Sequence, residues 1–143
     1  MYPEEMTKPM RLELVESGVT ELVTAADVAR ELDNAKGTAV VLINSVCGCA
    51  AGAARPGYLM AKEALEAQPD RWLTAFAGVH KEAVDAVRAR VPAPPSSPCI
   101  VLFKDGKPVT MMHRSDIEVR NAQGVAGVLE AMFREFCRVE AKS

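Results

Sequence analysis

Apolar residues follow two different spacings along this chain, and together they predict alternating strands and helices. The segment 38–44, TAVVLIN, is apolar without alternation, which is typical of a central parallel strand covered on both faces. The dipeptide Asp105-Gly106 is a strong signal for a β-hairpin between the strands on either side of it. Further strands are predicted over 19–23, 72–78, 99–103 and 108–112.

The segments between these strands place apolar residues at helical spacing. Thr24 followed by Asp27 is typical of a capping box, so a helix is predicted from there to the polar and glycine residues of 34–37. Pro56 lies inside the helix expected over about 50–67, and we therefore expect a kink or an irregular first turn. Further helices are predicted over 9–18, 80–91 and 121–138, with 1–8 as a loose leader and 92–98 as a constrained loop.

The resulting order of elements is β-α-β-α-β-α-β-β-α. The alternating part predicts parallel strands with helices on both faces, and the final hairpin adds an antiparallel edge. We find no internal repeat and no second domain, so the sequence predicts one α/β domain over 1–143, in which 1–18 form an N-terminal extension.

Composition narrows the possible functions. The net charge of −2 and the aromatic content of 5% do not favour binding to nucleic acid. No apolar run approaches the ~20 residues of a membrane span, and the N-terminus does not resemble a signal peptide. We therefore expect a cytoplasmic protein whose four cysteines are thiols at rest. The pattern makes no prediction of oligomeric state.

Two of these cysteines, Cys47 and Cys49, lie one residue apart in NSVCGCAAGAARP (44–56). They follow a predicted parallel strand and precede a helix, which is where open α/β sheets place their sites. Backbone N–H groups at a helix start favour a thiolate, the nucleophilic form of cysteine. A disulfide between these residues requires a non-helical segment, and Gly48 permits an unusual backbone angle there.

Other roles for the cysteines are open to test. Cys99 opens a strand and Cys137 ends a helix, which favours structural roles for both. A zinc or iron–sulfur site would need ligands in addition to the C-x-C pair, and their spacing is not typical of metal modules. A cysteine hydrolase would need His80 or His113 as its base.

The residues SVCGCA, together with SSP at 96–98, resemble the bacilliredoxins, and the resemblance covers nearly the full length of the chain. The order of elements is also similar to that of thioredoxin. This similarity implies a thioredoxin-like fold with a central mixed sheet, a cis peptide bond before Pro98, and backbone groups of Ser97 that face a bound substrate.

The sequence departs from thioredoxin at three positions. Ala50 occupies the place of the usual second cysteine, and Val46 replaces the tryptophan that precedes the first. Val41, six residues before Cys47, stands where thioredoxins carry a buried acid. The usual proton relay is therefore absent, and we expect Cys47 to be acidified mainly by backbone N–H groups of 48–52.

The resemblance implies a thiol-disulfide oxidoreductase that removes bacillithiol from client proteins carrying it as a mixed disulfide. It assigns Cys47 as the nucleophile and Cys49 as the resolving thiol, with bacillithiol or another small thiol exchanging at the site. It implies no tightly bound cofactor and no metal, and weak disulfide isomerase activity as a secondary property.

Charged residues near the motif are candidates for substrate contacts. His113 and Arg114, in a loop after the last strand, could meet a carboxylate of the thiol ligand. Arg55 is a further candidate, although a solvated position on its helix is also compatible with the pattern, and Asp116 and Glu118 are interpreted as solvated loop acids. The alternative function is a redox- or metal-sensing binding module that uses the same cysteines.

Overall fold

A mixed β-sheet forms the centre of the molecule. The computed structural model describes residues 2–33 and 36–137. Within these ranges five strands lie in the order β1-β3-β2-β4-β5, and β1, β3 and β2 run parallel, while β4 is antiparallel to β2 and β5 to β4. The strands are β1 (Thr20–Glu21), β2 (Thr38–Asn44), β3 (Arg71–Phe76), β4 (Cys99–Lys104) and β5 (Lys107–Met112).

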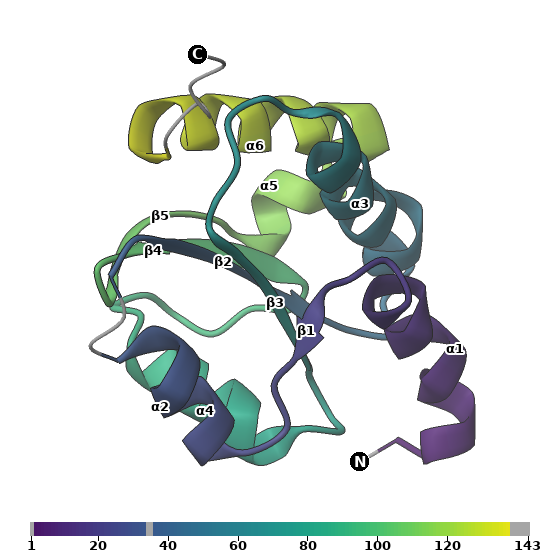
Figure 1. The fold of residues 1–143 in the computed structure, drawn as a ribbon. Coiled ribbons are helices and arrows are strands. Elements are labelled where there is room, and N and C mark those ends of the chain that lie inside the picture. The colour runs from purple at the N-terminus through teal and green to yellow at the C-terminus, as the bar shows by residue number, and fades with distance from the viewer. Residues whose placement is uncertain (1, 34–35, 138–143) are drawn as a thin grey trace.

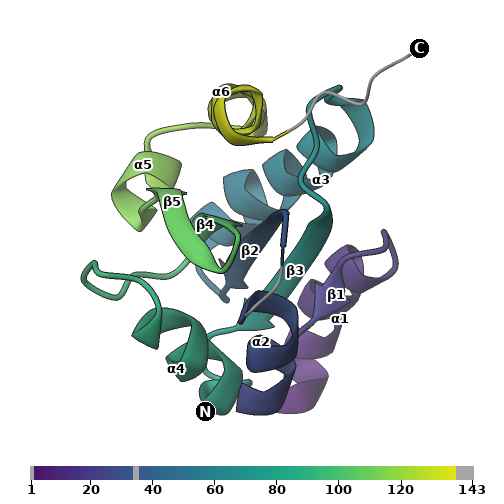
Figure 2. The same cartoon turned by 60° about the vertical axis from the view of Figure 1, so that its left-hand side comes forward.

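Helices cover both faces of this sheet, as Figures 1 and 2 show, with α2 and α4 on one side and α3 and α6 on the other. The helical elements are α1 (Glu4–Val15), α2 (Ala25–Leu32), the π-helix η1 (Ala50–Ala54), α3 (Arg55–Ala64), α4 (Lys81–Ala89), α5 (Arg114–Glu118) and α6 (Ala122–Phe136). The predicted mixed sheet flanked by helices is confirmed.

The central strand β2 is buried along its whole length, as its unbroken apolar sequence predicts. Val40 and Leu42 belong to the core that packs under α3 and α6, whereas Val41 and Ile43 belong to the core on the α2 and α4 side. Because both faces of β2 are packed, the strand fixes the position of the segment that follows Asn44 at the end of the sheet.

Local signals in the sequence account for the start of α2 and for the turn between β4 and β5. Thr24 and Asp27 form the predicted capping box: the Asp27 N–H donates to Thr24 Oγ1 at 3.1 Å, and the Thr24 N–H donates to the Asp27 carboxylate at 3.1 Å. Asp105 and Gly106 both have positive φ, which is the conformation that a two-residue hairpin turn requires.

Two sequence predictions are wrong in detail. The leader expected over 1–8 is helical from Glu4, because Pro3 precedes the first turn and α1 continues through Pro9. The loop expected to carry His113 and Arg114 is the short helix α5, whose start is fixed where the His113 N–H donates to the Asp116 carboxylate at 3.0 Å. In the described part of the chain, no helix is long and apolar enough to cross a membrane.

Candidate active site

The two neighbouring cysteines lie at the end of β2, where the strand turns into the next helix. The Cys47 N–H donates to Ser45 Oγ at 3.1 Å, which holds the turn closed. The Cys47 carbonyl then accepts the N–H groups of Ala50 and Ala51 at 3.0 and 3.3 Å. The helix begins as the π-helix η1 and continues as α3 from Arg55, so the expected irregular turn before Pro56 is present.

The two sulfur atoms lie together, because Cys47 Sγ and Cys49 Sγ are 2.7 Å apart as a hydrogen-bonded pair of free thiols. Both side chains are half-buried, so an approaching sulfur can reach them. The sequence prediction that a Cys47–Cys49 disulfide requires a non-helical segment stays a prediction, because both cysteines are free thiols here. In this dithiol state Cys49 has helical φ and ψ, and Gly48 does not have positive φ. The turn at Cys47, before the helix is established, lets the sulfurs meet.

The surroundings shift the pKa values of the two thiols in opposite directions. The pKa of Cys47 is lowered by the hydrogen bond from the Cys49 thiol, then by the Cys49 N–H, and also by the charge of Arg114. The pKa of Cys49 is raised by burial and by its hydrogen bond to Cys47. The expected acidification by backbone N–H groups is therefore present but second to the partner thiol. Val41, at the place of the thioredoxin acid, is fully buried among apolar residues.

Pro98 lies beside this turn through the pairing of β4 with β2. The register places Cys99 opposite Ile43, so Ser97 and Pro98 adjoin the end of β2 from which the cysteines follow. The Ser97–Pro98 peptide bond is cis, as the resemblance implies. Pro98 is buried and Ser97 is half-buried, which leaves Ser97 at the surface next to the cysteine turn.

Arg114 lies close enough to act on both sulfurs, and α5 contacts η1. Its side chain is half-exposed and forms an ion pair with Glu118 at 3.5 Å. An open groove of about 500 Å³ runs along this side of the molecule. It is lined by Pro94, Pro95, Ser96, His113, Arg114, Ser115 and Glu118. The groove thus joins Arg114 and His113 to the loop that carries Ser97.

Arg55 does not lie on the solvated face of its helix. The residue is only 4% exposed, and its guanidinium points inward. Nη1 donates to Asn44 Oδ1 and to the Ser45 carbonyl, both at 3.0 Å, and Nε pairs with the Glu13 carboxylate at 2.9 Å. The structure therefore places Arg55 beneath the cysteine turn rather than in the groove, away from the position in which it would meet a ligand at the surface.

The remaining candidates are separate from the sulfur pair. His80 is buried at the start of α4, and its Nδ1 accepts the Phe76 N–H at 3.2 Å. Burial raises the pKa of Cys99 to about 11 and also raises that of Cys137. Both buried thiols are therefore less acidic than a free cysteine, which disfavours them as nucleophiles. No group of three or more histidine, cysteine or acidic side chains within 2–33 and 36–137 could hold a metal ion.

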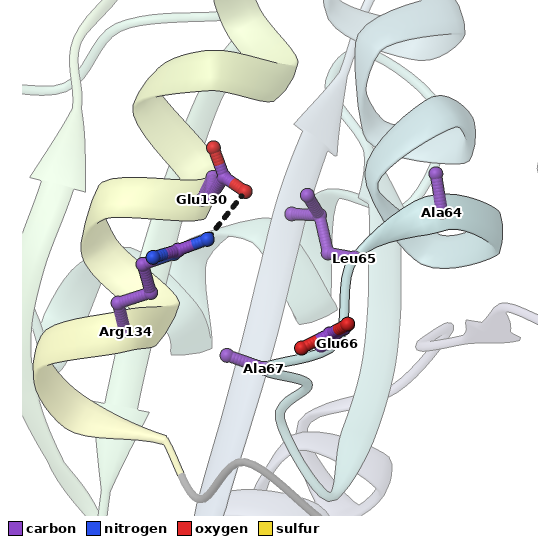
Figure 3. A pocket seen from close by; sticks show the side chains of 6 residues that line it. All are labelled: Ala64, Leu65, Glu66, Ala67, Glu130 and Arg134. Atoms are coloured by element: carbon purple, nitrogen blue, oxygen red, sulfur yellow. Dashed lines mark hydrogen bonds and ion pairs between the residues drawn. The ribbon is translucent and has the colours of Figure 1, made fainter.

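A second hollow, of about 310 Å³, lies at the other end of α3, between Leu65 and the helix α6. Figure 3 shows the ion pair of Glu130 with Arg134 on one of its walls. Because α3 begins below the cysteine turn and ends at Ala64, this hollow is remote from the sulfur atoms.

Sequence reasoning missed three residues that hold the cysteine turn: Glu13, Asn44 and Ser45. Asn44 was visible as a polar residue that ends an otherwise apolar strand, and such a residue needs a buried hydrogen-bond partner. Glu13 carried no comparable signal, because its contact with Arg55 spans 42 residues of sequence.

Solved thioredoxins share this fold. The chain is similar to thioredoxin from Malassezia sympodialis with a TM-score of 0.60 and 12% identity, over 83% of this chain and 90% of the other. Its similarity to Fasciola hepatica thioredoxin has a TM-score of 0.57 and 21% identity, over 82% and 99% of the two chains. Two adjoining thiols at the end of the central strand of this fold form a site that suits thiol-disulfide exchange.

Sequence comparison places the chain more narrowly. The model of the family described as disulphide isomerase matches residues 2–137. Bacilliredoxin from Salinibacter ruber is 47% identical over 95% of this chain and 81% of its own length. Bacilliredoxin from Cytophaga hutchinsonii is 46% identical over 94% and 99%, and that from Bacillus cereus is 42% identical over 95% of each. The chain belongs to the bacilliredoxin family and is a thiol-disulfide oxidoreductase.

Proposed function

We propose that this oxidoreductase removes bacillithiol from proteins that carry it as a mixed disulfide. The observation that carries the proposal is the pair of free thiols 2.7 Å apart, in which the pKa of Cys47 is lowered and that of Cys49 is raised. The name of its relatives supports the choice of bacillithiol as the exchanging thiol. We further propose that the protein acts in the reducing cytoplasm without a tightly bound cofactor.

The reaction proceeds by two thiol-disulfide exchanges. The Cys47 thiolate attacks the bacillithiol sulfur; a Cys47–bacillithiol disulfide forms, and the client leaves as a thiolate. Cys49 then gives its proton to solvent and its thiolate attacks Cys47 Sγ. A Cys47–Cys49 disulfide forms, bacillithiol leaves as a thiolate, and two equivalents of a small thiol reduce the disulfide again. In the alternative second step, a small thiol attacks the bacillithiol sulfur directly and frees Cys47.

The groove beside Arg114 gives the thiol ligand a place to bind. Arg114 offers a guanidinium for a ligand carboxylate, and His113 lies next to it on the same wall. Ser97 presents backbone groups from the neighbouring loop. The same chemistry supports weak disulfide isomerase activity as a secondary property, in line with the description of the matching family.

Intact-mass analysis with a bacillithiolated test protein examines this proposal. Cys49→Ser should take one bacillithiol and hold it on Cys47, whereas Cys47→Ser should leave the test protein modified. Cys137→Ser is the matched control, since this buried thiol lies at the end of α6 and should turn over like the natural protein.

Other outcomes would assign another role. If Cys47→Ser removes bacillithiol from the test protein and Cys49→Ser does not, the roles of the two cysteines are reversed. A natural protein that becomes oxidised but never frees the test protein would indicate a redox sensor. Bound metal in the mass spectrum, with no bacillithiol adduct, would favour the metal-sensing alternative.

A further inference from the structure

Arg55 is a buried cation that the exchange reaction itself does not use. Its side chain is 5% exposed, and among the residues that the structure describes its one carboxylate partner is Glu13, which is 46% exposed. A guanidinium removed from water is costly unless its donors are paired, and here three hydrogen bonds of 2.9–3.0 Å from Nε and Nη1 meet that need. The burial therefore ties Arg55 to the groups that it binds.

Those partners lead directly to the nucleophile. Nη1 of Arg55 donates to Asn44 Oδ1, which also accepts the Ser45 N–H at 2.9 Å. The same Nη1 donates to the Ser45 carbonyl, and Ser45 Oγ accepts the Cys47 N–H at 3.1 Å. Hydrogen bonds thus link Asn44, Ser45 and Cys47 in series, and the guanidinium binds the first two.

The other end of the guanidinium reaches the N-terminal helix. Arg55 Nε pairs with Glu13 of α1, and Asn44 Nδ2 donates to the Met10 carbonyl of the same helix at 3.3 Å. Helix α1 is further fixed by Leu14, which is fully buried in the core with α3 and α6. The extension before β1 is therefore joined to the cysteine turn by two polar contacts.

The planar geometry of the guanidinium group explains why arginine is needed at this position. One planar guanidinium binds a carboxylate through Nε and two neutral oxygens through Nη1, whereas a lysine ammonium is a single point that cannot span these three acceptors. The charge of Arg114 lowers the pKa of Cys47. The three contacts of Arg55 fix the position of the turn.

We propose that Arg55 is a positioning residue which, anchored by Glu13, locks the turn Asn44–Cys47 so that the Cys47 sulfur stays beside that of Cys49. Through this contact the N-terminal helix takes part in setting the reactivity of the nucleophile. The inference rests on the proposed role of Cys47 as the attacking thiol. It adds Arg55 and Glu13 to the residues that control the reactivity of this thiol.

The test measures alkylation of Cys47 by iodoacetamide against pH, with the modified residue identified by peptide mass mapping. Iodoacetamide is neutral and has no carboxylate for an arginine to bind, so it reports on the thiol alone. In Arg55→Met we expect the midpoint to rise by about one pH unit and the rate at pH 7 to fall about tenfold, because the sulfurs no longer stay together. Arg55→Lys should not restore the natural midpoint or the natural rate.

Two further variants separate charge from geometry and from general stability. Glu13→Gln keeps an acceptor for Arg55 Nε and removes the charge, so it should slow alkylation by less than about threefold, which corresponds to less than half a pH unit. Arg90→Met removes an arginine that pairs with Asp33 at 2.6 Å on the α2 and α4 side. It should leave the Cys47 profile unchanged.

An Arg55→Met protein that alkylates like the natural one, yet no longer removes bacillithiol, would overturn the inference and make Arg55 a ligand contact. If Arg55→Met does not fold, as judged by circular dichroism, Arg55→Lys decides: a natural profile in that variant overturns the inference. Failure of the proposed function is distinct, since the natural protein would then alkylate with a low midpoint but transfer no bacillithiol.

Discussion

Gly57 lies where α3 packs closely against α6, and replacing it with alanine tests that contact. A Cβ atom at this position would be 2.7 Å from Val125 Cβ and 2.8 Å from the Ala122 carbonyl oxygen. Real Cβ atoms do not approach this closely, and a backbone oxygen cannot move aside without moving its helix. Gly57→Ala must therefore push α3 and α6 apart.

The magnitude follows from two opposing effects. Overpacking a well-filled contact costs about 1–3 kcal/mol, and a clash with backbone belongs at the upper end. Alanine in a helix is favoured over glycine by about 1 kcal/mol, which offsets part of that cost. We expect Gly57→Ala to lower the free energy of unfolding by about 2 kcal/mol. Gly127 on α6 has nothing within 4 Å, so Gly127→Ala should raise it by about 0.5–1 kcal/mol.

Urea unfolding followed by tryptophan fluorescence measures both variants. The chain has one tryptophan, Trp72, whose ring lies edge-on to Phe133 of α6 with centroids 5.4 Å apart. The signal therefore reports on the α6 side of the core. If Gly57→Ala proves as stable as Gly127→Ala, the close approach of the two helices is wrong.

Two further predictions concern the cysteine turn. In Gly48→Ala the dithiol protein should keep its stability within about 0.5 kcal/mol, since a Cβ there meets nothing within 4 Å and φ is not positive. The Cys47–Cys49 disulfide should form more slowly if that bond needs the freedom of glycine; equal rates of disulfide formation by mass spectrometry would exclude this role. Cys49→Ser keeps a hydroxyl donor to Cys47, whereas Cys49→Ala removes it, so the alkylation midpoint of Cys47 should be higher in the alanine variant. Equal midpoints would show that the backbone N–H groups dominate after all.

Much of the fold could be predicted because its signals are local. The apolar run of β2, the capping box of Thr24 and the hairpin at Asp105-Gly106 each lie within a few residues, and each is present in the structure. The cysteine pair was found in the same way, since two thiols one residue apart at a strand end form a compact signal.

What could not be predicted depends on contacts between distant segments. Arg55 follows the motif at a spacing that fits a solvated helix position, yet the structure buries it against Glu13 of α1. The helix predicted over 9–18 also begins too late, since α1 starts at Glu4 and passes through Pro9. Burial by a remote segment leaves no periodic trace in the sequence.

The site also shows how the chain manages without the buried acid of thioredoxin. Val41 faces an apolar core, so no carboxylate in β2 can take a proton from Cys49. The polar groups are found instead in the turn above the strand, where Asn44 and Ser45 are held by Arg55. These groups bind the backbone of the turn and do not exchange protons. In the proposed mechanism, a site built in this way suits exchange with a single thiol adduct, because the Cys49 thiol stabilises the Cys47 thiolate until the second step.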